Sequence, residues 1–253
     1  MKLYQKLIQT CKYFFIKNPI IILHCLRFEE HVWRICDKIN CKEYHTYRKI
    51  DLAKIQSTIS VSKNLEISFI FSLNSSIASS LIPKLYNGNV EALELHGQNI
   101  SFNDLLFFSK TIQQIDLQKS TVFYQNGIIV PHEIIVANLP KLLCFKCDSN
   151  ANYDFSNTVT ELLKIQNFKN LKFFFLYGLN ESFDMETFFK QYLKKNIQTV
   201  FCFEYFDNVP LSDEYKEKLQ NITDEVLAAE LPLFVFFDGQ DRAYELMNLL
   251  EIF

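Results

Sequence analysis

Two cysteines, Cys144 and Cys147, form the first candidate for a chemical site in this sequence. A C-x-x-C pair binds zinc when a second such pair or two histidines complete the tetrahedral ligand set. None follows at ligand spacing. Residues three apart on a strand also point to opposite faces of the sheet. We therefore expect two buried thiols here and no metal ion.

A second candidate for metal binding lies closer to the N-terminus. His31 and His45 flank Cys36 and Cys41 in the spacing H-x4-C-x4-C-x3-H, which loosely matches a metal knuckle. The same segment carries apolar residues at helical spacing over residues 32–39, as a structural helix would. We favour the structural helix.

The sequence lacks the motifs of catalysis and nucleotide binding. It has no H-E-x-x-H and no G-x-S-x-G, which would supply a zinc site or an exposed serine nucleophile. Its 5 glycines form no G-x-G-x-x-G or Walker-type loop that could approach a phosphate. The net charge of −3, without a dense Lys/Arg cluster, argues against a nucleic-acid partner. We predict no catalytic residue, no cofactor and no metal, with an α/β enzyme that uses an unrecognised site as one alternative.

The cysteine pattern and the apolar runs bear on the compartment. The 7 cysteines are odd in number and widely scattered, unlike a disulfide framework. The longest apolar run near the N-terminus, residues 19–23, is too short to cross a bilayer, and no small-residue cleavage site follows it. We expect a cytoplasmic or nuclear protein in a reducing compartment, with no membrane partner.

The elements that would position any site are predicted by an internal repeat. A six-residue pattern that is apolar at positions one, four and six recurs as VEALEL, IQQIDL, LPKLLC, LKFFFL, IQTVFC and LPLFVF, starting at Val90, Ile112, Leu139, Leu171, Ile197 and Leu231. This is the L-x-x-L-x-L pattern of leucine-rich repeats. It predicts one short strand per repeat, with the residues at positions four and six in the core.

Helices are expected between these strands. Apolar residues at helical spacing predict them near residues 102–108, 159–165, 185–193, 212–222 and 243–253, with Ser101 as the cap of the first. Alternating strands and helices also fit a doubly wound sheet. The constant phase of the hexamer favours another α/β fold over the doubly wound sheet. We predict an irregular leucine-rich-repeat solenoid over residues 51–253, preceded by a short α-helical segment over residues 1–50.

The phase of the repeat also predicts the concave face of such a solenoid. In the first repeats the outward side chains are polar and include Glu94, His96 and Asp116. In the later repeats they are aromatic: Phe145, Phe173, Phe175, Tyr177, Phe201 and Phe203. Large apolar surfaces are unusual on monomers, and aromatic residues are favoured interface anchors, so we predict a protein-binding groove. The alternative is that these strands are buried on both faces, which continuous apolar runs such as FFFL favour.

The N-terminal residues 3–23 carry a family resemblance. Leu7, Ile8, Cys11, Lys12, Tyr13 and Phe14 resemble the last part of an F-box, where a Leu-rich helix runs into a Cys-Lys-Tyr-Phe stretch. With irregular repeats behind it, the chain resembles nematode-type F-box proteins. The resemblance implies that Leu7, Ile8, Cys11, Tyr13 and Phe14 bind the small adaptor subunit of a cullin-type ubiquitin ligase, while the repeats recruit substrates. The Leu-Pro start of the F-box and its first helix are missing, so a standalone binding or inhibitory protein is the alternative.

Overall fold

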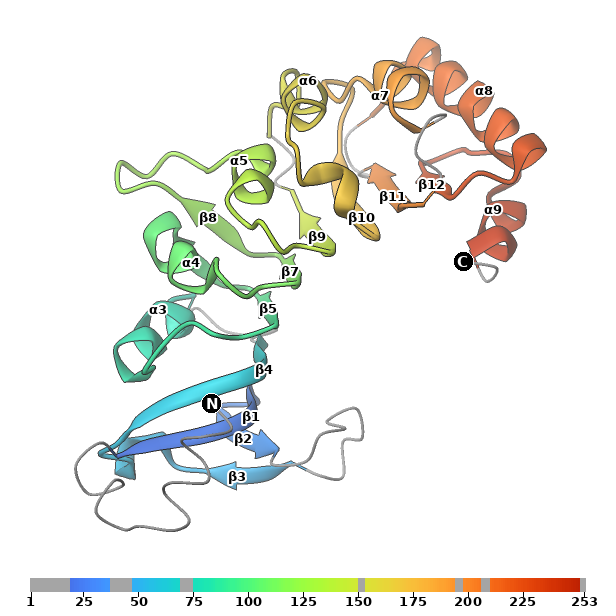
Figure 1. Ribbon diagram of the computed structural model, residues 1–253. Coiled ribbons are helices and arrows are strands. Elements are labelled where there is room, and N and C mark those ends of the chain that lie inside the picture. Colours follow the sequence, from blue (N-terminus) through green and yellow to red (C-terminus); the bar gives the residue numbers. More distant parts are fainter. Residues whose placement is uncertain are drawn as a thin grey trace. The chain divides into compact units, whose positions relative to one another are not determined.

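The computed structural model describes residues 19–36, 47–68, 75–149, 153–193, 198–205 and 210–250 of the chain. These residues fall into two compact units, unit 1 within residues 1–129 and unit 2 within residues 130–253. The F-box-like residues Leu7, Ile8, Cys11, Tyr13 and Phe14 lie outside the described residues. Helices connect successive parallel strands from β4 onward in unit 1 and throughout unit 2 (Figure 1).

Unit 1 is built on a sheet with the strand order β7-β5-β4-β1-β2-β3. Its elements are β1 (Ile20–Glu29), β2 (Val32–Cys36), β3 (Arg48–Ile50), β4 (Thr58–Ser68), α3 (Ile77–Leu81), β5 (Ala92–His96), β6 (Asn99–Ser101), α4 (Phe102–Phe108), β7 (Gln114–Gln118) and β8 (Thr121–Phe123). The strands β7, β5, β4 and β1 pair in parallel, and β1, β2 and β3 pair antiparallel. A small parallel pair, β6 and β8, forms a second sheet.

The N-terminal part of unit 1 is a β-hairpin where a helix was expected. The helix predicted over residues 32–39 is wrong over its described part, because Val32–Cys36 is strand β2. Glu30 and His31 make the two-residue turn with φ values of 49° and 61°, the left-handed conformation that such tight hairpin turns require. Opposite side chains meet across the hairpin: the rings of Phe28 and Trp33 are 4.8 Å apart. Strand pairing also crosses residue 50, the expected domain boundary, since β1 pairs with β4.

The core of unit 1 consists of aliphatic residues in register across parallel strands. Leu65 on β4, Leu93 on β5 and Ile115 on β7 form one row, each at most 1% exposed. The next row along the strands consists of Ile67, Leu95 and Leu117. The hexamer phase is therefore confirmed for these repeats. Figure 1 shows α3 and α4 together beside these strands, and α4 begins as predicted, with the Ser101 hydroxyl accepting a hydrogen bond from the backbone N–H of Asp104.

A buried polar contact links successive turns of unit 1. Gln98 follows β5, Ser120 follows β7, and both are buried. The backbone N–H of Gln98 donates to the Ser120 hydroxyl at 2.9 Å, and that hydroxyl donates to the Leu95 carbonyl at 2.8 Å. These bonds satisfy backbone groups that the turns would otherwise bury without partners.

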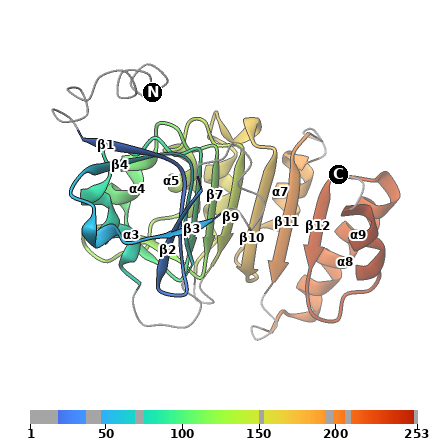
Figure 2. The ribbon, with the colours of Figure 1, turned by 90° about the horizontal axis from the view of Figure 1, so that it is seen from below.

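Unit 2 has four parallel strands in the order β12-β11-β10-β9. Its elements are α5 (His132–Ala137), β9 (Cys144–Asp148), α6 (Thr158–Leu162), β10 (Phe173–Leu179), α7 (Met185–Gln191), β11 (Val200–Tyr205), α8 (Asp213–Ala229), β12 (Leu233–Phe236) and α9 (Ala243–Leu250). Figure 2 shows β10, β11 and β12 side by side. The predicted alternation of parallel strands and helices is confirmed within each unit. The Ser212 hydroxyl caps α8 by accepting a hydrogen bond from the backbone N–H of Tyr215.

The core of unit 2 is aromatic, and it corrects part of the predicted concave face. Phe145, Phe174 and Phe201 lie in register on neighbouring strands, and each is 0% exposed. Phe203, also 0% exposed, packs against Phe183 and Phe188, with ring centroids 5.2 Å away from each. Phe145, Phe201 and Phe203 were expected on the concave face but belong to this core. The phase of β9 and β11 differs from the hexamer because each includes part of an unbroken apolar run, residues 142–145 and 200–203, which leaves the apolar pattern ambiguous by one residue.

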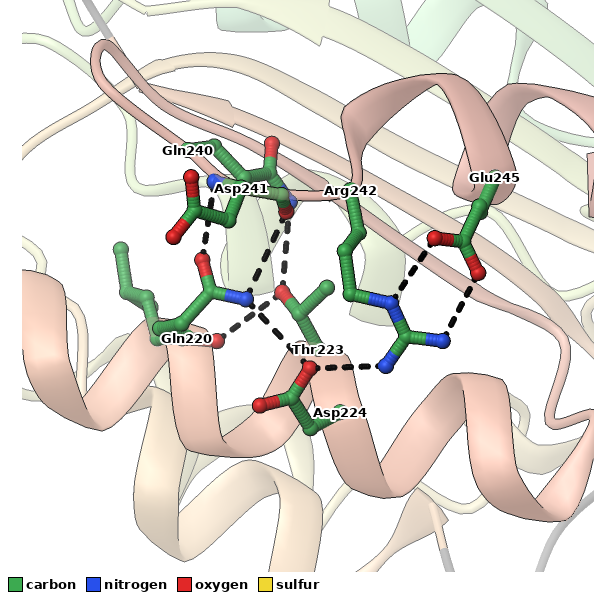
Figure 3. A network of polar contacts seen from close by, with 8 residues as sticks. Gln220, Thr223, Asp224, Gln240, Asp241, Arg242 and Glu245 are labelled. Atoms are coloured by element: carbon green, nitrogen blue, oxygen red, sulfur yellow. Dashed lines mark hydrogen bonds and ion pairs between the residues drawn. The ribbon is translucent and has the colours of Figure 1, made fainter.

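Polar contacts join the last helix to the helix before it. In Figure 3 the Arg242 guanidinium donates to Asp224 on α8 and to Glu245 on α9, at 3.0 Å and 2.7 Å. The Gln240 amide donates to the Val235 carbonyl at 2.8 Å and to the Thr223 hydroxyl at 3.2 Å. The ion pairs are about half exposed, so they contribute little to stability. They fix the position at which α9 begins.

The aromatic core gives a test of the strand phase in unit 2. Phe203→Ala should lower the free energy of unfolding by about 3–5 kcal/mol, because it leaves a cavity among packed rings. Phe173→Ala should lower it by less than about 1 kcal/mol, because Phe173 is 40% exposed. Urea unfolding followed by circular dichroism measures both. Equal losses in the two variants would contradict the assignment of Phe203 to the core.

Candidate protein-binding surface

The sheet face opposite the core rows, here called the open face, carries the candidate site in each unit. In unit 2 the register assigns these residues to it: Cys144, Lys146, Asp148, Phe173, Phe175, Tyr177, Val200, Cys202, Glu204, Phe234 and Phe236. Phe173, Phe175 and Tyr177 therefore lie where the sequence placed them. They form one column along β10, because alternate residues of a strand share a face.

The aromatic column is most accessible at its start. Phe173 is 40% exposed, and its ring centroid is 6.1 Å from that of Phe175. The Lys146 ammonium lies 5.1 Å from the centroid of the Phe175 ring, a cation–π contact. Leu143, just before β9, is 38% exposed. The column is thus an accessible apolar strip with a cation lying over one ring.

Exposure falls across the same face toward the last strand. Cys202 on β11 is 8% exposed and Phe234 on β12 is 0% exposed, although they lie in the same row as Phe175. The helix α9 contacts β12. The alternative of strands buried on both faces therefore describes β12, whereas β10 keeps part of this face accessible, and the groove stays a prediction.

The Cys202 thiol of unit 2 is a poor nucleophile. Burial, reinforced by the Glu204 carboxylate, raises the pKa of Cys202 to about 12. A thiol with so high a pKa stays protonated at neutral pH, and the thiolate is the reactive form. Cys144 lies on the open face and Cys147 in the core, 3% exposed, so the C-x-x-C pair points to opposite faces as predicted.

The open face of unit 1 carries three carboxylates in one row, here called the carboxylate row. In register, Glu66 on β4 pairs with Glu94 on β5, and Glu94 pairs with Asp116 on β7. His96 lies next to the row, two residues beyond Glu94 on the same face of β5. Glu94, His96 and Asp116 thus share one face, as the sequence predicted.

Glu66 and Glu94 of the carboxylate row each accept a hydrogen bond from a neighbouring side chain. The Arg27 guanidinium donates to the Glu66 carboxylate at 2.6 Å, in a pair whose side chains are 14% and 8% exposed. Glu94 accepts a hydrogen bond of 3.0 Å from the Asn64 amide. Burial raises the pKa of Glu94, the carboxylates of Glu66 and Asp116 raise it further, and the Asn64 hydrogen bond offsets part of the rise.

The carboxylate row lacks the arrangement of a metal site but suits a cationic group. In the part of the chain that the structure describes, no three His, Cys, Asp or Glu side chains are grouped so that they could hold a metal ion. Adjacent like charges on neighbouring strands destabilise a sheet. A lysine or arginine side chain from a partner would relieve that repulsion, because its charge is opposite.

A buried histidine in unit 2 has a structural role. The His132 ring stacks near Phe155 and Tyr153, with centroids 5.9 Å and 4.4 Å away, and burial lowers its pKa to about 4. Its Nε2 atom is 3.4 Å from the Ser149 hydroxyl, a distance at the outer limit of a hydrogen bond. Packed among aromatic rings in its neutral form, His132 acts as a core residue.

Several residues of these surfaces were not singled out from the sequence. Lys146 and Glu204 were detectable, because a charged residue on an otherwise apolar strand marks the face away from the core. Arg27 and Glu66 were not, since only strand pairing brings them together across 39 positions.

Comparisons with protein-family models, with curated proteins and with solved structures gave no match. The resemblance to F-box proteins with leucine-rich repeats therefore stays a prediction. Among the described residues, no helix combines the length and apolar character needed to cross a membrane.

The carboxylate row predicts that Glu94→Gln stabilises the chain at neutral pH. The pKa of Glu94 is raised on folding, so the unfolded chain ionises this group at lower pH and the wild type loses stability as the pH rises above the ordinary value of 4.5. Glutamine can still accept from Asn64 but carries no charge. The advantage of the variant in thermal unfolding should be present at neutral pH and vanish below pH 4.5.

The matched control for this measurement is Glu91→Gln. Glu91 is exposed and pairs with Lys63, so its replacement should change stability little at either pH. A loss of stability in Glu94→Gln at neutral pH would contradict the role assigned to the row.

Proposed function

We propose that the chain is a protein-binding module, an irregular leucine-rich-repeat solenoid that engages a partner protein through the open faces of its sheets. The strand order supports the solenoid. In unit 1 β4, β5 and β7 are neighbours in chain order, and so are β9 to β12 in unit 2. Repeats that stack on their predecessors give this order, whereas a doubly wound sheet reverses its strand order at a switch point.

The observation that carries the proposed function is the accessible aromatic column of β10. Phe173 and Phe175 lie on the open face, with the Lys146 ammonium over the Phe175 ring. Aromatic side chains held on rigid strands lose little conformational entropy on binding, and such residues dominate the energetics of interfaces. The open face of unit 1 would add selectivity, because the carboxylate row favours a partner with lysine or arginine at the contact.

The aromatic column can be tested by comparing the proteins that cross-link to the full chain in cells. Phe173→Ala combined with Phe175→Ala should remove the specific partner, with at least about a tenfold loss of recovery if the two anchors together supply 2 kcal/mol or more. The control is Tyr86→Ala, which removes an aromatic side chain that is 58% exposed and belongs to none of the strands. If a partner is still recovered with the double variant but is lost with the control variant, the column is not the binding site.

The ligase link rests on the F-box resemblance of residues 7–14, and the alternative is a binding or inhibitory module without it. We expect the purified small adaptor subunit of cullin-type ligases to bind the full chain. Leu7→Asp with Phe14→Asp should abolish that binding, since the resemblance assigns both residues to the adaptor contact. Isothermal titration calorimetry measures it. If the adaptor does not bind a chain with native circular dichroism, the standalone module is the better account.

A further inference from the structure

Two cysteines of unit 1 face each other across the N-terminal hairpin. Cys25 on β1 and Cys36 on β2 are directly opposite in the antiparallel register. Residues opposite each other in such a ladder point to the same face of the sheet. Both carry a thiol rather than a disulfide, and they are 3% and 0% exposed.

The spacing of a β-ladder brings these thiols within reach of one another. Opposite residues of an antiparallel pair have Cα atoms about 4.5 or 5.5 Å apart, depending on the hydrogen-bonding position. Disulfides are made across Cα separations of about 4.4–6.8 Å, so either position allows the bond without moving the strands. The Phe28–Trp33 pair shows that opposite side chains of this hairpin do meet, at 4.8 Å between ring centroids.

We propose that Cys25 and Cys36 are a modification site, a thiol pair that forms a reversible disulfide with a small-molecule disulfide such as oxidised glutathione as the oxidant. The thiolate of one cysteine attacks a sulfur of oxidised glutathione, which forms a mixed disulfide and releases one glutathione. The second cysteine attacks the protein sulfur of that mixed disulfide and releases the other glutathione. Two cysteine thiols are oxidised, one glutathione disulfide is reduced to two thiols, and both protons end on glutathione.

Burial of the two thiols limits the rate of this reaction and determines which disulfide accumulates. A thiol that is 0% exposed meets glutathione only when the hairpin opens locally, and Cys36 is the last residue of β2, where strands open most readily. Once one thiol has reacted, re-pairing of the strands delivers the other to it. The mixed disulfide is therefore short-lived, and the bond between the strands is the product that accumulates.

The bond would fasten β2 to β1, the strand whose Arg27 binds the first member of the carboxylate row. Arg27 lies two residues beyond Cys25 on the same face of β1, and Arg34 pairs with Arg27 on β2. Arg27 in turn holds Glu66, the first member of the row. Oxidation would thus tie β2 to the strand that supplies the cation for this surface.

The experiment uses the full chain in glutathione buffers of increasing oxidised fraction, followed by acid quenching, alkylation and tryptic digestion. Trypsin separates the two cysteines, because it cleaves after Lys17, Arg27, Arg34 and Lys38. The expected product is peptide 18–27 linked to peptide 35–38 by a disulfide, which disappears on reduction with dithiothreitol. The link should persist in Cys147→Ala and be absent in Cys36→Ala.

Wild-type mapping alone decides the proposal, so it does not depend on the folding of any variant. Glutathione adducts at Cys25 or Cys36 without the link would overturn it, as would a link from either residue to Cys41. The same oxidation in concentrated urea should give mixed pairings. An equal yield of the 18–27 to 35–38 link in the unfolded chain would show that the hairpin register is not its cause.

Discussion

The stacking of one core residue per strand, in register across parallel strands, is the constraint on which both units depend. Leu65, Leu93 and Ile115 make such a row in unit 1, and Phe145, Phe174 and Phe201 make one in unit 2. Because side chains alternate between the faces of a strand, each row also determines what lies on the opposite face. The carboxylate row and the aromatic column are therefore consequences of how the core is aligned.

The sequence predicted the elements of this fold better than the phase of its strands. Leu93 and Leu95 flank the polar residue Glu94, and such alternation leaves one possible phase in unit 1. In unit 2 Phe145 and Phe201 were assigned to the wrong face, because each lies in an unbroken apolar run, residues 142–145 and 200–203. Lys146 and Glu204 mark the open face of β9 and β11 and would have corrected those two strands.

Other features could not have been predicted from the sequence by any local rule. All four residues of β12, Leu233–Phe236, are apolar, so the sequence does not show which of them face the core. Only the pairing of β12 with β11 assigns Phe234 to the open face. The hairpin of residues 20–36 carries apolar residues at both helical and strand spacing, and pairing with β4 decides between them. The Arg27–Glu66 pair likewise exists only because strands distant in sequence are neighbours.

The two open faces differ in their effect on the stability of the folded chain. The aromatic column packs against itself and under the Lys146 stem, so presenting it to a partner requires little strain. The carboxylate row places Glu94 between two like charges and raises its pKa. Functional surfaces are often held at the expense of stability. An unfavourable row kept on an otherwise well-packed sheet is therefore consistent with a surface that serves a partner rather than the fold.

The pairing of β1 with β4 has a consequence for the order in which the chain is made. In unit 2 each strand pairs with the strand synthesised before it, so the sheet can grow as the ribosome delivers it. In unit 1 the β1–β2 hairpin emerges first and waits for β4 with one edge of β1 bare. Such edges invite pairing with other nascent chains, and charged residues discourage it. Arg27, Glu29 and Arg34 would then act as gatekeepers during synthesis, before any of them contributes to the finished surface.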